Sequence, residues 1–266
     1  MSTGTYAPKP GAAPVGRMIA AQTALETRML LRNGEQLLLT VIIPSLLLVL
    51  FSTVDIIAVP VPTAGGADKA VDFLAPGVLA LAVLSTAFTG QAIATGFERR
   101  YGVLKRLGAS PLPRWALMTS KTLAVLVTEI LQIALLTAIA LGLGWSPQGV
   151  ATFTGVLSVL LLLVLGTAAF SGLGLLMAGT LKAEATLAAA NLVFLLLLVG
   201  GGVVVPLEKF PDTARQVLEL LPISALSDGL RAILQNGAPM PWGDALTLAV
   251  WAVLGLGAAA KFFRWE

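Results

Sequence analysis

The chain has 266 residues, of which 57% are hydrophobic and 12% charged, and its mean hydropathy is +0.90. It contains no cysteine and no histidine, which excludes a disulfide framework, thiol chemistry and the commonest metal ligand and general base. A net charge of +3 would suit a nucleic-acid partner, but the basic residues stand beside long apolar runs, a pattern that indicates orientation in a membrane. We therefore predict no metal site, no catalytic residue and no nucleic-acid partner.

The N-terminal region divides into a tail and an amphipathic helix. Residues 1–16 are rich in Pro, Gly and Ala and lack the features of a cleavable signal, so we expect a disordered cytoplasmic tail. Residues 17–34 are predicted to form an interfacial helix in the cytoplasmic leaflet. Its apolar face would comprise Met18, Ala21, Leu25 and Met29, and its polar face Arg17, Glu26, Arg28 and Arg32.

Long uncharged stretches predict an all-α integral membrane protein with six transmembrane helices, because a span needs roughly 20 apolar residues. The expected spans are Gln36–Val54, Phe73–Phe97, Trp115–Leu143, Thr152–Met177, Thr186–Val205 and Trp242–Phe263. A Gly-, Ser- and Pro-containing turn at 144–149 separates the third span from the fourth. The external segment 206–241 has short amphipathic stretches, which predict short helices that dip into the outer leaflet.

The distribution of Lys and Arg orients these spans. With six spans and both termini cytoplasmic, 13 of the 17 basic residues lie inside and four outside, which agrees with the positive-inside rule. The four expected outside are Lys69, Lys209, Arg215 and Arg231.

The densest charge lies in residues 98–114, between the second and third spans. Glu98 directly follows a span, Gly102 permits a sharp bend, and Pro111 prevents a helix from continuing. Between them, Val103, Leu104 and Leu107 would give a short helix an apolar side and leave Lys105 and Arg106 exposed. Such a helix can dock into a groove of a soluble partner; the alternative is a solvated loop that only orients the spans.

Ionisable and polar residues inside spans are candidates for a pathway. Glu129 is the strongest of these candidates, because placing a carboxylate at membrane depth costs free energy. Gln132 lies one helical turn away from it. Glu129 is interpreted either as a substrate or proton site or as a hydrogen-bonded pin between helices. Thr89, Gln91 and Asn191 would place polar groups on the second and fifth spans, where they line a path or simply bond neighbouring helices.

Two separated segments resemble those of ABC-2 type permeases, the membrane subunits of ABC exporters that include the daunorubicin-resistance type. The first is Glu98-Arg99-Arg100-Tyr101-Gly102-Val103-Leu104-Lys105-Arg106-Leu107 with Ser110-Pro111-Leu112-Pro113-Arg114-Trp115 and Lys121; the second comprises Pro206, Phe210-Pro211, Pro222, Asp228 and Arg231. Together with the predicted spans, the resemblance covers residues 17–266 as a single transmembrane domain.

The resemblance implies that residues 98–114 form a cytoplasmic coupling loop that contacts a separate ATP-binding subunit. The positions expected to transmit motion are Glu98, Arg99, Gly102, Leu104, Lys105, Arg106 and Pro111. The chain has no phosphate-binding Gly-x-x-x-x-Gly-Lys loop, and its Gly200–Gly202 run is not followed by Lys, so ATP and Mg²⁺ would be used by the partner alone. The chain itself would be no enzyme and would hold no cofactor.

The resemblance further implies a homodimer or heterodimer of permeases in a bacterial cytoplasmic membrane, exporting drugs, antibiotics, lipids or other amphipathic or hydrophobic cargo. The alternative is a secondary transporter driven by an ion gradient, for which Glu129 is the one clear intramembrane carboxylate. A membrane-embedded enzyme is a poor interpretation, because paired catalytic groups are missing. A haem-handling exporter lacks the usual histidine ligand.

Overall fold

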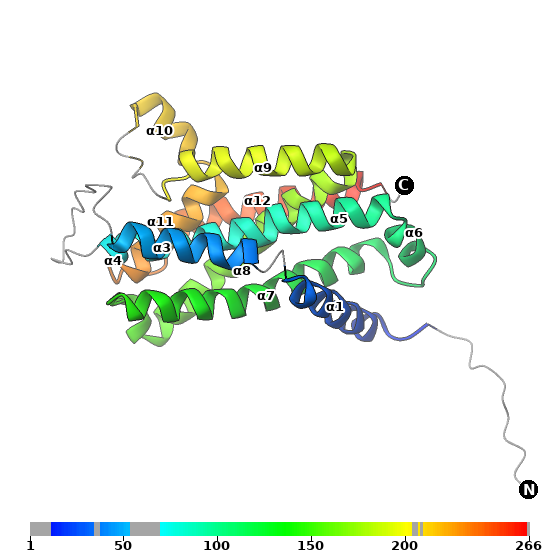
Figure 1. The fold of residues 1–266 in the computed structure, drawn as a ribbon, viewed down its shortest axis with the longest axis horizontal. Helices are drawn as coiled ribbons and strands as arrows, with labels where there is room; N and C mark the ends of the chain where they lie inside the picture. The colour runs from blue at the N-terminus through cyan, green and yellow to red at the C-terminus, as the bar shows by residue number, and fades with distance from the viewer. Residues whose placement is uncertain (1–11, 35–37, 54–69, 204–206, 208–209, 265–266) are drawn as a thin grey trace, which may run out of the picture.

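The computed structural model describes residues 12–34, 38–53, 70–203, 207 and 210–264. Over these residues the secondary structure is helical, and the long helices run side by side along one axis (Figure 1). Five are long and apolar enough to cross a membrane: Ala70–Arg100, Arg114–Gly142, Phe153–Thr180, Ala183–Gly200 and Trp242–Phe262. The first predicted span is represented by a shorter apolar helix, Thr40–Thr53.

The central element is the helix Ala70–Arg100, which comprises α4 (Ala70–Val83), the π-helical segment η2 (Leu84–Gly90) and α5 (Gln91–Arg100). Of its apolar window, 94% is buried inside the protein. A helix that is apolar all round is expected in the interior of a bundle. Preceding it in the chain are a second π-helical segment, η1 (Leu38–Ile42), and α3 (Ile43–Thr53).

The remaining spans surround this helix. They are α7 (Arg114–Gly142), α8 (Phe153–Thr180), α9 (Ala183–Gly200) and α12 (Trp242–Phe262). Small residues let α8 and α12 approach closely, since a Cβ added to Gly172 would stand 2.5 Å from the backbone nitrogen of Leu256. The α7–α8 connection contains η3 (Gly149–Ala151), and the Thr152 hydroxyl caps α8 by accepting a hydrogen bond from the Gly155 N–H at 3.1 Å.

The predicted interfacial helix is present as α1 (Val15–Arg32), but one of its faces differs from the prediction. Gln22 and Glu26 are its buried residues, because α1 packs on α7, whereas Leu25 and Met29 are half-exposed. Glu26 was expected on the solvated side. Its carboxylate turns inward instead, because Lys121 of α7 provides an opposite charge there.

The external segment forms α10 (Asp212–Leu218) and α11 (Pro222–Leu234), which lie at the opposite end of the bundle from α6 (Val103–Gly108) and the C-terminus (Figure 1). No residue of α10 is buried. In contrast, α11 is almost entirely buried against α4, α8 and α12. It is part of the protein interior and does not dip freely into a leaflet.

Candidate coupling surface and membrane cavity

The charged segment between α5 and α7 folds as the sequence predicts. Gly102 has a φ of 72°, a left-handed conformation that turns the chain between α5 and α6. On α6, Leu104 is fully buried, whereas Lys105 and Arg106 are exposed. Leu104 lies in a small apolar cluster with Leu117, Met118, Leu175, Ala259 and Phe263. This cluster fixes the orientation of α6 and presents its basic side outward.

Pro111 lies in the exposed turn that follows α6. The Ser110 hydroxyl donates a hydrogen bond to the Leu107 carbonyl at 2.5 Å and so closes the end of α6. Pro113 then caps α7 in an extended conformation. The predicted residues Gly102, Lys105, Arg106 and Pro111 therefore share one exposed region at the end of the bundle, which we call the α6 surface.

Glu98 does not belong to the α6 surface, although the sequence suggested that it contacts a partner. Its carboxylate lies 2.6 Å from the Lys121 ammonium, which also donates to Glu26 at 3.0 Å. Gln22 donates to the second oxygen of Glu26 at 2.8 Å. These side chains join α1, α5 and α7 in a buried ion cluster directly behind the α6 surface.

The two arginines that follow Glu98 join the central helix to the turn between α8 and α9. Arg99 donates a hydrogen bond to the Leu181 carbonyl, and Arg100 pairs with Glu184. Arg99, one of the positions predicted to transmit motion, is partly buried against this turn. The end of α5, which directly precedes the α6 surface in the chain, is thus connected by side chains to α1, α7 and the start of α9 (Ala183–Gly200).

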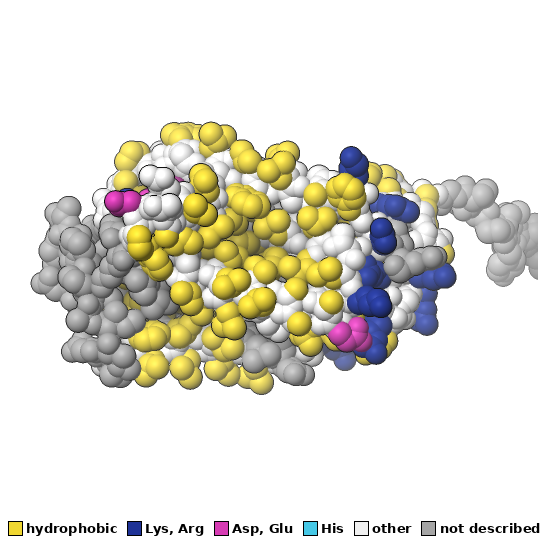
Figure 2. Space-filling view, turned by 90° about the horizontal axis from the view of Figure 1, so that it is seen from above, with side chains coloured by type: hydrophobic (Ala, Val, Ile, Leu, Met, Phe, Trp, Pro, Cys, Tyr) yellow, Lys and Arg dark blue, Asp and Glu magenta, His cyan; other side chains and the backbone are white. Residues whose placement is uncertain are grey.

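Basic side chains gather at this end of the molecule. Figure 2 shows Lys and Arg concentrated at the end that carries α6, with apolar side chains over the body of the bundle. The exposed basic residues of this end are Arg100, Lys105, Arg106, Arg114, Lys182, Lys261 and Arg264. Such a belt suits the cytoplasmic boundary of a membrane protein.

Glu129 lies deep in the bundle on α7 and is 1% exposed. The Thr167 hydroxyl of α8 donates a hydrogen bond to its Oε2 at 2.5 Å. Among the described residues, Oε1 of Glu129 has no hydrogen-bond partner. This contact joins α7 to α8, which favours the interpretation of Glu129 as a pin between helices.

Gln132 does not act with Glu129 but bridges the two π-helical segments. Its Oε1 accepts a hydrogen bond from Thr86 of η2 at 2.7 Å, and its Nε2 donates to the Thr40 carbonyl of η1 at 2.5 Å. π-Helical turns inside α-helices occur frequently at functional sites. The space beside η1 and η2, which Gln132 joins, is therefore a candidate functional site.

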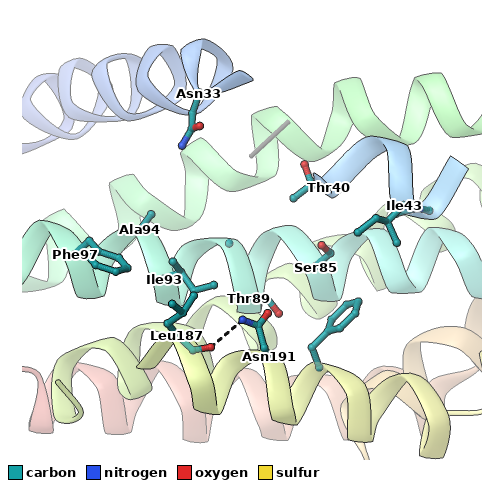
Figure 3. A pocket seen from close by; sticks show the side chains of 13 residues that line it. Asn33, Thr40, Ile43, Ser85, Thr89, Ile93, Ala94, Phe97, Leu187 and Asn191 are labelled. Carbon is teal, nitrogen blue, oxygen red and sulfur yellow. Dashed lines mark hydrogen bonds between the residues drawn. The ribbon is translucent and has the colours of Figure 1, made fainter. Parts of the chain in front are cut away.

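A cavity of about 510 Å³ lies in that space, between η1, α3, the central helix and α9 (Figure 3). Thr89 and Asn191, both predicted pathway residues, line it together with Thr40, Ile43, Ile93 and Leu187. The Asn191 amide donates to the Leu187 carbonyl of its own helix at 3.0 Å. Gln91, the third candidate, points elsewhere and accepts a hydrogen bond from Ser171 of α8 at 2.7 Å.

Three of the predicted external residues, Pro222, Asp228 and Arg231, lie on α11. Pro222 is its first residue, and Arg231 is anchored by the Val203 carbonyl at 2.9 Å, by Asp228 at 3.2 Å and by the Phe73 ring, whose centroid lies 4.0 Å from the guanidinium. Phe210 lies before α10 and is half-buried. Pro206 falls outside the described residues. Arg231 thus holds α11 in place, and none of the described external residues lines the cavity of Thr89 and Asn191.

Comparison with known proteins relates the chain to membrane transport proteins. Residues 14–261 match the family described as ABC-2 family transporter protein. The chain is 25% identical over 250 residues to a Bacillus subtilis (strain 168) protein named "Putative transport permease YvfS", with 93% of this chain and 97% of that protein covered. The match to the family extends over most of the chain, including every helix from η1 to α11. The chain therefore belongs to the ABC-2 transporter family and is a non-catalytic, multi-pass membrane permease subunit.

Proposed function

We propose that this permease forms half of the translocation path of an ATP-driven exporter that moves amphipathic or hydrophobic cargo outward. The observation that carries the proposal is the α6 surface: a short helix anchored by Leu104 that presents Lys105 and Arg106 to solvent, in a chain of the ABC-2 family. A docking helix of this kind suits a groove on a separate ATP-binding subunit, which would bind ATP and Mg²⁺.

The proposed topology has six spans, with both termini in the cytoplasm and α1 in the cytoplasmic interface. Support comes from the basic belt at the α6 end and from the exposed apolar residues of α1. The helix Thr40–Thr53 is proposed as the core of the first span, although it is shorter than the roughly 20 residues that a straight crossing requires. The membrane is proposed to be the bacterial cytoplasmic membrane.

The complex is proposed to contain two permeases, identical or related, and two ATP-binding subunits. The 510 Å³ cavity is lined by apolar side chains such as Phe194 and by the polar Thr89 and Asn191, which suits an amphipathic cargo such as a drug, an antibiotic or a lipid. Closure of the ATP-binding subunits would push on the α6 surface. The ion cluster would pass that motion to α1 and α7, and so open the cavity to alternate sides of the membrane.

Co-purification tests the coupling surface directly. The tagged chain is purified in a mild detergent from its native membranes, and its partners are identified by mass spectrometry. We expect an ATP-binding subunit with the wild type and its loss with the double variant Lys105→Glu/Arg106→Glu. The matched control is Lys261→Glu, which reverses an exposed charge at the same end of the molecule on α12.

Retention of the ATP-binding subunit by the double variant would contradict the proposed docking site. A wild-type chain that retains no such subunit, under conditions that keep other membrane complexes intact, would contradict the exporter proposal as a whole. Transport that survives ATP depletion and collapses with the proton gradient would instead support the ion-gradient alternative.

A further inference from the structure

A second cavity, of about 320 Å³, lies between α1, the central helix and α7. It adjoins the larger cavity, because Asn33, Ala94 and Phe97 line both. Its lining includes the three charged members of the ion cluster, Glu26, Glu98 and Lys121. The cluster that joins the helices therefore also forms the wall of an open space.

The charges in this wall do not balance. Among the described residues that line the cavity, Glu26 and Glu98 are acidic and Lys121 is the one basic residue. The Lys121 ammonium contacts both carboxylates, so ionised side chains leave one negative charge in excess. The nearby Arg28 and Arg32 of α1 are exposed and do not line the cavity. An excess charge in a poorly hydrated site is costly unless an opposite charge approaches it.

Polar groups without partners face the same space. Gln91 and Thr95 line the cavity and are 4% and 1% exposed. Within the described part of the chain, the Gln91 amide nitrogen and the Thr95 hydroxyl have no hydrogen-bond partner. Buried polar groups are normally hydrogen-bonded, so the Gln91 amide and the Thr95 hydroxyl offer two groups that can bond a polar substituent in this cavity.

The rest of the lining is apolar and aromatic. Phe97 and Tyr101 stack with their ring centroids 6.2 Å apart, and Tyr101 and Met29 are exposed at the edge of the cavity. Aromatic faces attract cations, and the combination of an acidic wall with an apolar body suits an organic cation better than a hydrated metal ion or an anion.

We propose that this cavity binds an amphipathic organic cation, such as an ammonium- or phosphonium-bearing molecule, before it enters the larger cavity. The inference rests on the proposed export function and names its cargo class. The positive group would lie against Glu26 and Glu98 and the apolar part against Phe97 and Met29, while Gln91 and Thr95 would bond polar substituents.

Binding of tetraphenylphosphonium to the full chain in lipid nanodiscs tests the proposal. Its matched control is tetraphenylborate, an anion of the same shape. We expect saturable binding of the cation that the anion does not displace, and an approximately tenfold weaker affinity in Glu98→Gln and in Glu26→Gln, since each removes the excess charge. Glu219→Gln, which removes an exposed carboxylate on the other side of the bundle, should bind as the wild type does.

A double variant separates charge from structural damage. Glu98→Gln/Lys121→Met restores one excess negative charge and is expected to recover most of the affinity that Glu98→Gln loses. Absence of saturable cation binding in the wild type, equal displacement by the anion, or a double variant as weak as Glu98→Gln would overturn the proposal. Co-purification of the ATP-binding subunit is measured on the same samples, so cation binding can fail while the exporter function stands.

Discussion

The two ends of the bundle are held together by different kinds of contact. At the α6 end, ion pairs join side chains of different helices, as in the Lys121–Glu98 contact at 2.6 Å and the Arg100–Glu184 pair, and they accompany bonds to the backbone such as that from Arg99 to the Leu181 carbonyl. At the α11 end, side chains bond the backbone: Arg231 donates to the Val203 carbonyl at 2.9 Å, and Asp72 accepts from the Ser146 N–H at 3.2 Å.

Close glycine contacts occur at both ends, since a Cβ on Gly179 at the α6 end would stand 3.0 Å from the Phe263 Cα, but two glycines at the α11 end approach backbone carbonyl oxygens. A Cβ on Gly77 would stand 2.7 Å from the Val203 carbonyl oxygen, and one on Gly149 would stand 2.3 Å from that of Ile233. Both contacts lie at the α11 end and fix the spacing of the backbones. In contrast, ion pairs between long side chains can persist while their helices shift. From the ion pairs at the α6 end and the close backbone contacts at the α11 end, we expect larger helix movement at the α6 end.

The largest loss of stability is expected from Arg231→Met at the α11 end. The substitution leaves the carbonyls of Val203 and Phe73 without their charged donor in a buried place, which costs about 2–4 kcal/mol. Thermal unfolding of the purified chain in detergent measures the effect. The control Arg215→Met removes an exposed pair with Glu219 and should cost less than about 0.5 kcal/mol. Equal melting of the two variants would contradict the anchoring of the α11 end by Arg231.

Charge reversal at Glu98 is expected to affect coupling more than stability. Glu98→Lys places a second cation beside Lys121, which repels α5 from α7 and disturbs the cluster that also holds α1, with at least a tenfold loss of permease-dependent ATP hydrolysis expected. The exchange Glu98→Lys/Lys121→Glu restores opposite charges between α5 and α7 but sets a carboxylate at position 121 against Glu26, so a partial recovery of the rate is expected. The chain has no cysteine, so a disulfide between Thr23→Cys and Ser120→Cys reports the α1–α7 contact. If the two cysteines cross-link as efficiently with Glu98→Lys as with Glu98 unchanged, the proposed role of Glu98 in holding the cluster together is contradicted.

Gly102 provides a graded test of how the α6 surface is oriented. Its φ of 72° is accessible to Gly, tolerated by Asn, unfavourable for Ala and forbidden to Pro. No neighbouring atom lies within 4 Å of an added Cβ, so the effect should follow backbone preference alone. Retention of the ATP-binding subunit is expected to fall in the order Gly, Asn, Ala, Pro, with about 1 kcal/mol separating Gly from Ala. Full retention by Gly102→Pro would show that the turn is dispensable.

Much of the architecture was predictable, because apolar length and turn residues specify helices directly. The predicted spans Trp115–Leu143 and Trp242–Phe263 match α7 and α12 to within a residue at each end. The burial of Leu104 beside exposed Lys105 and Arg106 also followed from local pattern. Periodicity suffices where one face of a helix meets the core and the other meets solvent.

The environments of Glu26, Glu98 and Gln91 were not predictable in the same way. Periodicity assigns a carboxylate to the polar face, but Lys121, 95 residues away from Glu26, draws it inward. Thr89 and Gln91 were expected on one polar edge, yet they line different cavities. The π-helical turn of η2 changes the helical register between Thr86 and Gln91, and a single sequence gives no clear signal for such a turn.

The smallest effect is expected from Glu129→Gln. Thr167 donates to this side chain, and an amide oxygen accepts the same hydrogen bond, so the joint between α7 and α8 persists. We expect a change in stability below about 1 kcal/mol and transport that is unchanged and insensitive to pH. Glu129→Leu removes this contact between α7 and α8 and should destabilise the chain by about 1 kcal/mol, since the Thr167 hydroxyl keeps the Leu163 carbonyl as an acceptor at 2.8 Å. Loss of transport in Glu129→Gln, with thermal unfolding unchanged, would instead show that the Glu129 carboxylate carries a proton or contacts cargo. The interior of the bundle would then contain a functional group apart from the α6 surface and the cavities.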